Sequence, residues 1–133
     1  MKLRSILLGA AALVTLSSFA ALAAEFVGGA VKTMTIEGKE VITDANDMTL
    51  YVWDKDAVGV SNCYDQCAAN WPPLIASADA QAEGDFTLVD RTDGTKIWAY
   101  KGRPLYLWVK DGKPGDTTGD GVGGSWHTAV EGM

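Results

Sequence analysis

The stretch that organises this chain is Leu50-Tyr51-Val52-Trp53-Asp54-Lys55-Asp56, which returns as Leu105-Tyr106-Leu107-Trp108-Val109-Lys110-Asp111. The offset between the two copies is 55 residues, as the step from Tyr51 to Tyr106 shows. The same offset carries Trp71 onto Trp126. Because one register holds over so long a span, the sequence predicts two related halves, repeat one at about 37–75 and repeat two at about 86–130.

The residues around these copies predict a mostly β fold. Runs rich in β-branched and aromatic residues predict strands at 31–36, 40–43, 50–53, 86–89, 95–100, 105–109 and 126–130. One short helix is predicted at about 62–69, capped by Ser61 or Asn62 and ended by Pro72 and Pro73. We therefore expect a single small domain of two pseudo-repeats, with roughly eight short strands and one helical turn.

The first residues predict export. Lys2 and Arg4 form a basic start, 6–16 is apolar, and small residues follow up to Ala23. This order is typical of a secretory signal peptide at 1–23, cleaved after Ala23. The apolar run is too short and too rich in alanine for a membrane span, so we expect a soluble mature domain at 24–133, periplasmic or secreted.

The charge of the mature chain limits the classes of partner that it can bind. The whole sequence has 11 basic and 17 acidic residues and a net charge of −6, and loss of Lys2 and Arg4 makes it −8. An acidic surface repels nucleic-acid backbones and anionic lipid, so we expect no nucleic-acid partner and no membrane contact after cleavage.

The ordered motifs of the chain resemble those of a known family. They are Tyr51-x-Trp53-x-x-Asp56 with its copy at 106–111, the segments 61–68 and 71–74, and the run 114–127. Together they resemble the secreted repeat family, described as predicted lipoproteins with a Tyr-x-(Phe/Trp/Tyr)-x-x-Asp motif and largely of unknown function. The resemblance covers residues 37–130. A lipoprotein needs a cysteine directly after the cleavage site, and the first cysteine here is Cys63, so this chain is expected to be free of a lipid anchor.

Cys63 and Cys67 are the two cysteines of the chain. On a helix, residues at i and i+4 lie roughly 6 Å apart, within the Cα separation that a disulfide tolerates. In an oxidising compartment such a pair most simply forms a structural disulfide. A redox-active dithiol is the alternative, although no cationic side chain adjoins the pair in the sequence to stabilise a thiolate.

Aromatic residues are the strongest compositional feature, with five tryptophans in the chain. The simpler interpretation is a core shared by the two halves. The functional alternative is an exposed shelf that stacks a flat ligand, with Tyr51, Trp53, Tyr106 and Trp108 as the candidate ligand-binding residues.

The glycine-rich segment 111–124 carries Asp111, Asp116 and Asp120, which form a weak calcium candidate. Its spacing is not that of an EF-hand and Lys113 intrudes, so a solvated loop is the simpler interpretation and we expect no metal. His127 is the single histidine and is expected to be structural.

No catalytic set emerges from these residues, and we expect a protein that is not an enzyme and holds no cofactor. The expected function is a non-catalytic binding or interaction module whose partner is a small molecule or a periplasmic protein. The alternative is a redox accessory protein that acts through Cys63 and Cys67 or docks an electron carrier.

Overall fold

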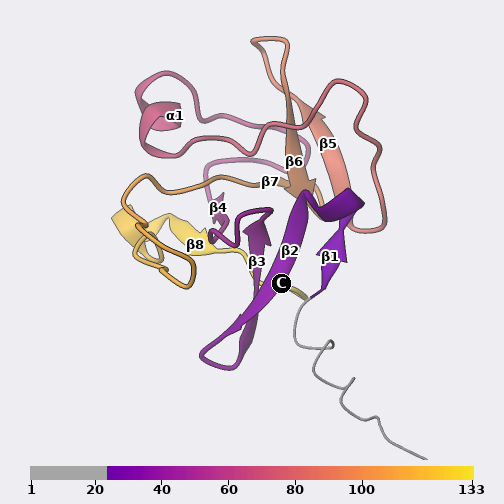
Figure 1. Cartoon of the computed structure of the whole chain (residues 1–133). Coiled ribbons are helices and arrows are strands. Elements are labelled where there is room, and N and C mark those ends of the chain that lie inside the picture. The colour runs from indigo at the N-terminus through magenta and orange to yellow at the C-terminus, as the bar shows by residue number, and fades with distance from the viewer. Residues whose placement is uncertain (1–23) are drawn as a thin grey trace, which may run out of the picture.

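The computed structural model describes residues 24–133 (Figure 1). The predicted signal peptide at 1–23 lies outside the described residues. The elements in chain order are β1 (Glu25–Phe26), η2 (Val27–Gly29), β2 (Val31–Ile36), β3 (Lys39–Asp44), β4 (Tyr51–Trp53), α1 (Gln66–Asn70), β5 (Phe86–Asp90), β6 (Lys96–Tyr100), β7 (Arg103–Pro104), η3 (Val122–Gly124) and β8 (Trp126–Thr128). The expected mostly β class is therefore confirmed.

The strands form three small antiparallel sheets, with the orders β1-β2-β3, β4-β8 and β5-β6-β7. The β2–β3 hairpin runs from the pair Val31 and Asp44 to the pair Ile36 and Lys39. Its turn requires Gly38, whose φ is +81°, a conformation that a side chain makes costly. This hairpin and the β5–β6 hairpin lie where the sequence predicts them.

The strand predicted at 105–109 is not continuous. In its place, β7 pairs with β6, and Tyr106 bridges both Tyr51 and Pro73. The partner segment begins with Pro72 and Pro73, and proline has no backbone N–H to donate to a ladder. Isolated bridges therefore replace a regular strand.

The helix begins later than the sequence predicts, at Gln66 instead of about residue 62. The N–H of Asn62 donates to Asp56 Oδ1 at 2.7 Å, and its side chain donates to the carbonyl of Lys55 at 2.9 Å. These bonds fix Asn62 against the preceding loop, so neither it nor Ser61 caps the helix. Asp65 occupies the cap position with a φ of +56°.

The two repeats interlock. Strand β4 of repeat one pairs with β8, the last strand of repeat two. In the corresponding place, the segment around Tyr106 pairs with 72–74 of repeat one, through bonds such as Leu107 N–H to the carbonyl of Pro72 at 2.8 Å. Each repeat therefore completes the other, and neither forms a separate lobe.

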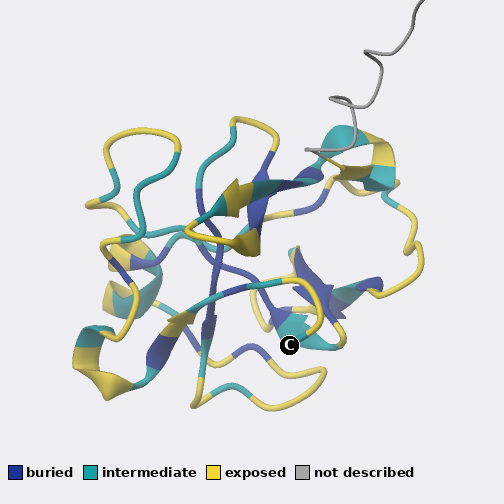
Figure 2. Cartoon of the chain, turned by 90° about the horizontal axis from the view of Figure 1, so that it is seen from below, coloured by how far each residue is buried: buried dark blue, intermediate teal, exposed yellow. Residues whose placement is uncertain are grey.

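The core lies along this interface. Figure 2 shows buried segments through the middle of the domain and exposed loop tips around it. One apolar cluster gathers around Ile42, Leu50 and Leu105, and a second, aromatic cluster around Tyr51 and Tyr106. The second cluster brings together residues that the sequence singled out for function.

Candidate functional site

Four tryptophans form one continuous stack, in the order Trp108, Trp71, Trp126 and Trp53. The central pair, Trp71 and Trp126, has ring centroids 3.8 Å apart and planes 3° apart. Trp108 lies 4.0 Å from Trp71, and Trp53 lies 5.1 Å from Trp126. Trp71 and Trp126 are repeat-related, as are Trp53 and Trp108, so the tryptophan stack has the pseudo-twofold symmetry of the repeat.

A tyrosine meets the stack edge-on from each repeat. Tyr51 approaches Trp71 with centroids 5.4 Å apart at 78°, and Tyr106 approaches Trp126 with centroids 5.3 Å apart at 90°. Edge-to-face contact places the positive ring edge against a negative π face, which is a favoured aromatic geometry. The two tyrosines therefore close the sides of the stack.

Each tyrosine donates its hydroxyl proton to the motif aspartate of the other repeat. Tyr51 Oη lies 2.6 Å from Asp111 Oδ2, and Tyr106 Oη lies 2.8 Å from Asp56 Oδ2. Burial, followed by the hydrogen bond to Asp111, raises the pKa of Tyr51. Burial is also the main reason that the pKa of Tyr106 is raised. The Tyr-x-Trp-x-x-Asp motif thus encodes two reciprocal hydrogen bonds, in which the tyrosine of each repeat donates to the aspartate of the other.

The four candidate ligand-binding aromatics occupy two different environments. Tyr51 and Tyr106 are fully buried. Trp53 and Trp108 are half-buried and lie at the two ends of the stack. The tyrosines belong to the core, and the terminal tryptophans alone among the four reach solvent.

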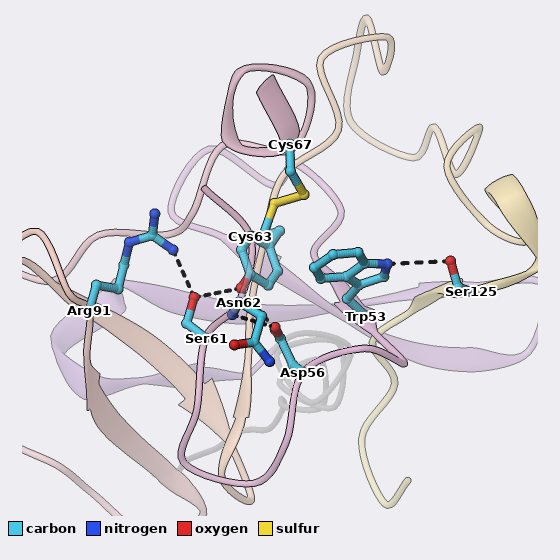
Figure 3. The surroundings of a disulfide bond; sticks show 9 residues. Trp53, Asp56, Ser61, Asn62, Cys63, Cys67, Arg91 and Ser125 are labelled. Carbon is cyan, nitrogen blue, oxygen red and sulfur yellow. Dashed lines mark hydrogen bonds between the residues drawn. A yellow bond between two sulfur atoms is a disulfide. The ribbon is translucent and has the colours of Figure 1, made fainter. Parts of the chain in front are cut away.

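Cys63 and Cys67 form a disulfide with a Cα–Cα distance of 5.2 Å. Cys63 precedes α1 and is fully buried, whereas Cys67 lies in its first turn and is half-buried. Figure 3 shows the disulfide between the Trp53–Ser125 hydrogen bond and the Ser61–Arg91 hydrogen bond. The bridge therefore links α1 to the wall of the aromatic core.

Arg91 is a residue that the sequence analysis did not identify. It is 6% exposed, its guanidinium donates to Ser61 Oγ at 2.7 Å, and it lies 4.1 Å from the ring centroid of Tyr64. Ser61 Oγ lies 2.7 Å from Tyr106 Oη, so one network runs from Arg91 to Asp56. Within the described residues, Arg91 Nε is buried without a hydrogen-bond partner. No sequence signal distinguishes this arginine from surface ones.

The three aspartates of the weak calcium candidate do not converge. Asp111 accepts from Tyr51 and Thr118, Asp116 pairs with Lys113, and Asp120 accepts from the N–H of Thr128. The hydrogen bond from Lys113 is the main cause that lowers the pKa of Asp116. Over residues 24–133 the structure contains no group of three or more histidine, cysteine, aspartate or glutamate side chains placed to hold a metal.

His127 is exposed and pairs with an aspartate that the sequence analysis did not connect to it. Its Nε2 lies 2.8 Å from Asp54 Oδ2, and Arg103 lies 3.8 Å from the other carboxylate oxygen of Asp54. Ser125 Oγ accepts from Trp53 Nε1 at 3.3 Å, so that hydroxyl is engaged by the stack.

A cleft of about 540 Å³ opens on the side of the domain where η2 faces the segment 75–83. Its wall includes Val27, Ala30, Ala80 and Trp98 among the apolar residues, and Ser77, Gln81 and Glu83 among the polar ones. Glu83 Oε1 accepts from the N–H of Val27 at 2.8 Å, which ties the two sides of the cleft together. No sequence pattern in residues 75–83 indicates this cleft.

The helices between residues 24 and 133 include none with the length and apolar character that crossing a membrane requires.

Fold and site together define a class: a single β-rich domain in which two repeats interlock around a shared aromatic core. The chain belongs to the family of secreted repeats of unknown function, whose family model matches residues 32–75 and 87–130. The expected family, the 55-residue offset and the secreted character are thereby confirmed. Comparison with curated proteins and with solved structures gives no match.

Proposed function

We propose that this protein is a non-catalytic binding module of the periplasm, and that it takes a small amphipathic molecule in the cleft between η2 and 75–83. The observation that carries this proposal is the cleft itself. Its volume of about 540 Å³ lies within the range of roughly 300–1,000 Å³ that is usual for small-molecule sites. A mixed apolar and polar wall is also typical of such sites.

The charge of the wall favours a neutral or cationic ligand. Glu83 is the charged residue that lines the cleft, and Val27, Ala30 and Ala80 give its wall an apolar part. The net charge of −6 for the chain adds a field that attracts cations. A small aromatic or aliphatic amine meets all three conditions.

The redox alternative through the cysteine pair has less support. Thiol exchange needs access to a sulfur and a stabilised thiolate; Cys63 is fully buried, and Cys67 is half-buried. A count of free thiols in protein isolated from the periplasm, with and without mild reductant, separates the two functions. A bridge that resists mild reduction supports the binding module.

The proposed binding is tested by titrating the isotope-labelled mature domain with a library of small amphipathic amines and neutral aromatic compounds. Binding in the cleft shifts the amide signals of Val27, Gly28 and Ala82. Ala82→Trp narrows the cleft and should abolish the shifts. Ala78→Trp is the matched control, because Ala78 is exposed in the same segment but lines a separate hollow of about 260 Å³. Binding that Ala82→Trp leaves unchanged would refute the cleft as the site.

A further inference from the structure

The tryptophan stack connects two points of the surface through the core. Its inner members, Trp71 and Trp126, are each 5% exposed, and its outer members, Trp53 and Trp108, are half-buried. Successive ring centroids lie 4.0, 3.8 and 5.1 Å apart. Rings in van der Waals contact exchange an electron readily, because electron tunnelling weakens steeply only as the gap between donor and acceptor widens. An oxidised outer indole can therefore regain an electron from an inner one.

The stack contacts two phenols whose hydroxyls are each hydrogen-bonded to a carboxylate. Tyr51 and Tyr106 touch Trp71 and Trp126, and each donates its hydroxyl hydrogen to a carboxylate, Asp111 or Asp56. The donor–acceptor distances of 2.6 and 2.8 Å are within the reach that proton transfer requires. Burial raises the pKa of both phenols, so each keeps its proton until it is oxidised.

The other two tyrosines lack this arrangement. Tyr64 Oη accepts a hydrogen bond from the N–H of Thr92, and its ring lies under Arg91. Tyr100 Oη accepts from the N–H of Gly132, and its ring packs on Phe86. Tyr51 Oη also accepts from the N–H of Gly119 at 3.1 Å, so the difference between the two pairs is the carboxylate, which takes up the proton that oxidation releases. The chain thus contains its own control pair.

We propose that the stack and its two tyrosine–aspartate pairs form a relay that moves one-electron oxidation from the surface into the core. The substrate of this relay is a small radical oxidant. It takes one electron from the indole of Trp53 or Trp108. The electron is replaced along the stack from Tyr51 or Tyr106. The tyrosine that supplies it passes its hydroxyl proton to Asp111 or Asp56 and becomes a neutral phenoxyl radical. The oxidant gains one electron, the tyrosine loses one electron and one proton, and the aspartate gains that proton.

The relay is tested by pulse radiolysis of the mature domain with the azide radical, which oxidises indole rapidly at neutral pH. The absorption of the one-electron-oxidised indole should decay as that of the phenoxyl radical rises, with a first-order rate independent of protein concentration. The double variant Tyr51→Phe/Tyr106→Phe should lose this conversion. Tyr64→Phe/Tyr100→Phe, the matched control, should keep it.

Three results would overturn the relay: no conversion in the unaltered domain, conversion that survives in the Tyr51→Phe/Tyr106→Phe variant, or conversion that the control variant loses. Should the first double variant lack native circular dichroism, deuterium oxide decides on the unaltered domain. Conversion that slows in deuterium oxide supports proton transfer to the aspartates, and an unchanged rate refutes it.

Discussion

Tyr51 and Tyr106 are hydrogen-bonded to each other through their backbones in both directions. The N–H of Tyr51 donates to the carbonyl of Tyr106 at 2.8 Å, and the N–H of Tyr106 donates to the carbonyl of Tyr51 at 2.9 Å. The two residues are related by the 55-residue offset of the repeats. The pseudo-twofold axis therefore passes between them, and the side chain of each reaches an aspartate of the other repeat. Changes at paired positions should consequently have matched effects.

The inner tryptophans should contribute most to stability. Trp71→Ala and Trp126→Ala should each lower the free energy of unfolding by about 3–5 kcal/mol, because each removes a large, buried ring and leaves a cavity. Trp53→Ala and Trp108→Ala should cost less, since these rings are half-buried. Urea denaturation followed by circular dichroism gives the four values. Terminal variants that cost as much as the inner ones would contradict the order of burial.

The disulfide should make a modest contribution to the free energy of unfolding. Cys63→Ala/Cys67→Ala removes a bridge with a sequence separation of 4 residues, and so short a loop restricts the unfolded chain little. The loss should be about 2 kcal/mol on the chain-entropy argument. Calorimetry of the oxidised domain and the double variant measures it, and mass spectrometry under non-reducing conditions confirms the bridge. Two free thiols in the exported protein would show that the bridge does not form.

Asp56 and Asp116 should shift stability in opposite directions with pH. Burial raises the pKa of Asp56 above its ordinary value of 3.8, so the folded state disfavours its charged form. Its contribution to stability is fully present below 3.8 and is lost as pH rises through the raised value. The hydrogen bond from Lys113 lowers the pKa of Asp116, so its contribution is present above 3.8 and is lost as pH falls through the lowered value.

The measurement compares each asparagine variant with the unaltered domain in urea at pH 7 and below pH 3.8. On acidification, the unaltered domain should gain stability relative to Asp56→Asn and lose stability relative to Asp116→Asn. If the stability difference from the unaltered domain changed equally with pH for the two variants, burial would not determine the pKa of Asp56.

The repeat made much of this architecture predictable. An offset visible in Tyr51, Trp53 and Trp71 and their copies is enough to infer two halves and a shared aromatic core. The sequence does not predict that Asp111 bonds to Tyr51, because that contact crosses 60 residues and depends on how the halves interlock. The sequence alone places Asp111 only in a weak calcium candidate, and the structure adds its hydrogen bond to a phenol.

Local patterns failed where tertiary contacts compete with them. The pattern around Asn62 favours a helix start, yet the carboxylate of Asp56 takes its N–H. Arg91 resembles any charged residue after a strand, and only the packed structure shows that it is buried against Ser61 and Tyr64. The cleft was missed for a related reason, since it needs η2 and 75–83 to face each other across the fold.

Calcium should leave the stability of the domain unchanged. Asp111, Asp116 and Asp120 are each engaged by a different donor and do not share a site. A ligand raises the melting temperature only if it binds the folded state in preference to the unfolded one. Thermal melts in about 1 mM calcium and in chelator should therefore coincide. This calcium concentration lies near the dissociation constants of weak extracellular calcium sites. A rise of several degrees that Asp116→Asn abolishes would establish a calcium site in the loop.

Within the glycine-rich loop, substitution of Gly119 should disturb the aromatic core most. A Cβ added there would lie 2.9 Å from the ring of Tyr51 and 3.0 Å from that of Trp71. Both rings are packed in the core and cannot move without disturbing the stack, so Gly119→Ala should cost about 1–3 kcal/mol, as overpacking does.

Gly112→Ala is the matched control in the same loop. Its added Cβ would have its nearest neighbour, Asp116 Oδ2, at 3.7 Å, which is ordinary contact. This variant should leave the free energy of unfolding nearly unchanged, and Gly119→Ala should also change the near-ultraviolet circular dichroism of the tryptophan stack. Equal stability of the two variants would show that the loop can move away from the core. In that case the glycine at 119 would serve the loop alone, and the close approach to Tyr51 would not determine which residue is tolerated there.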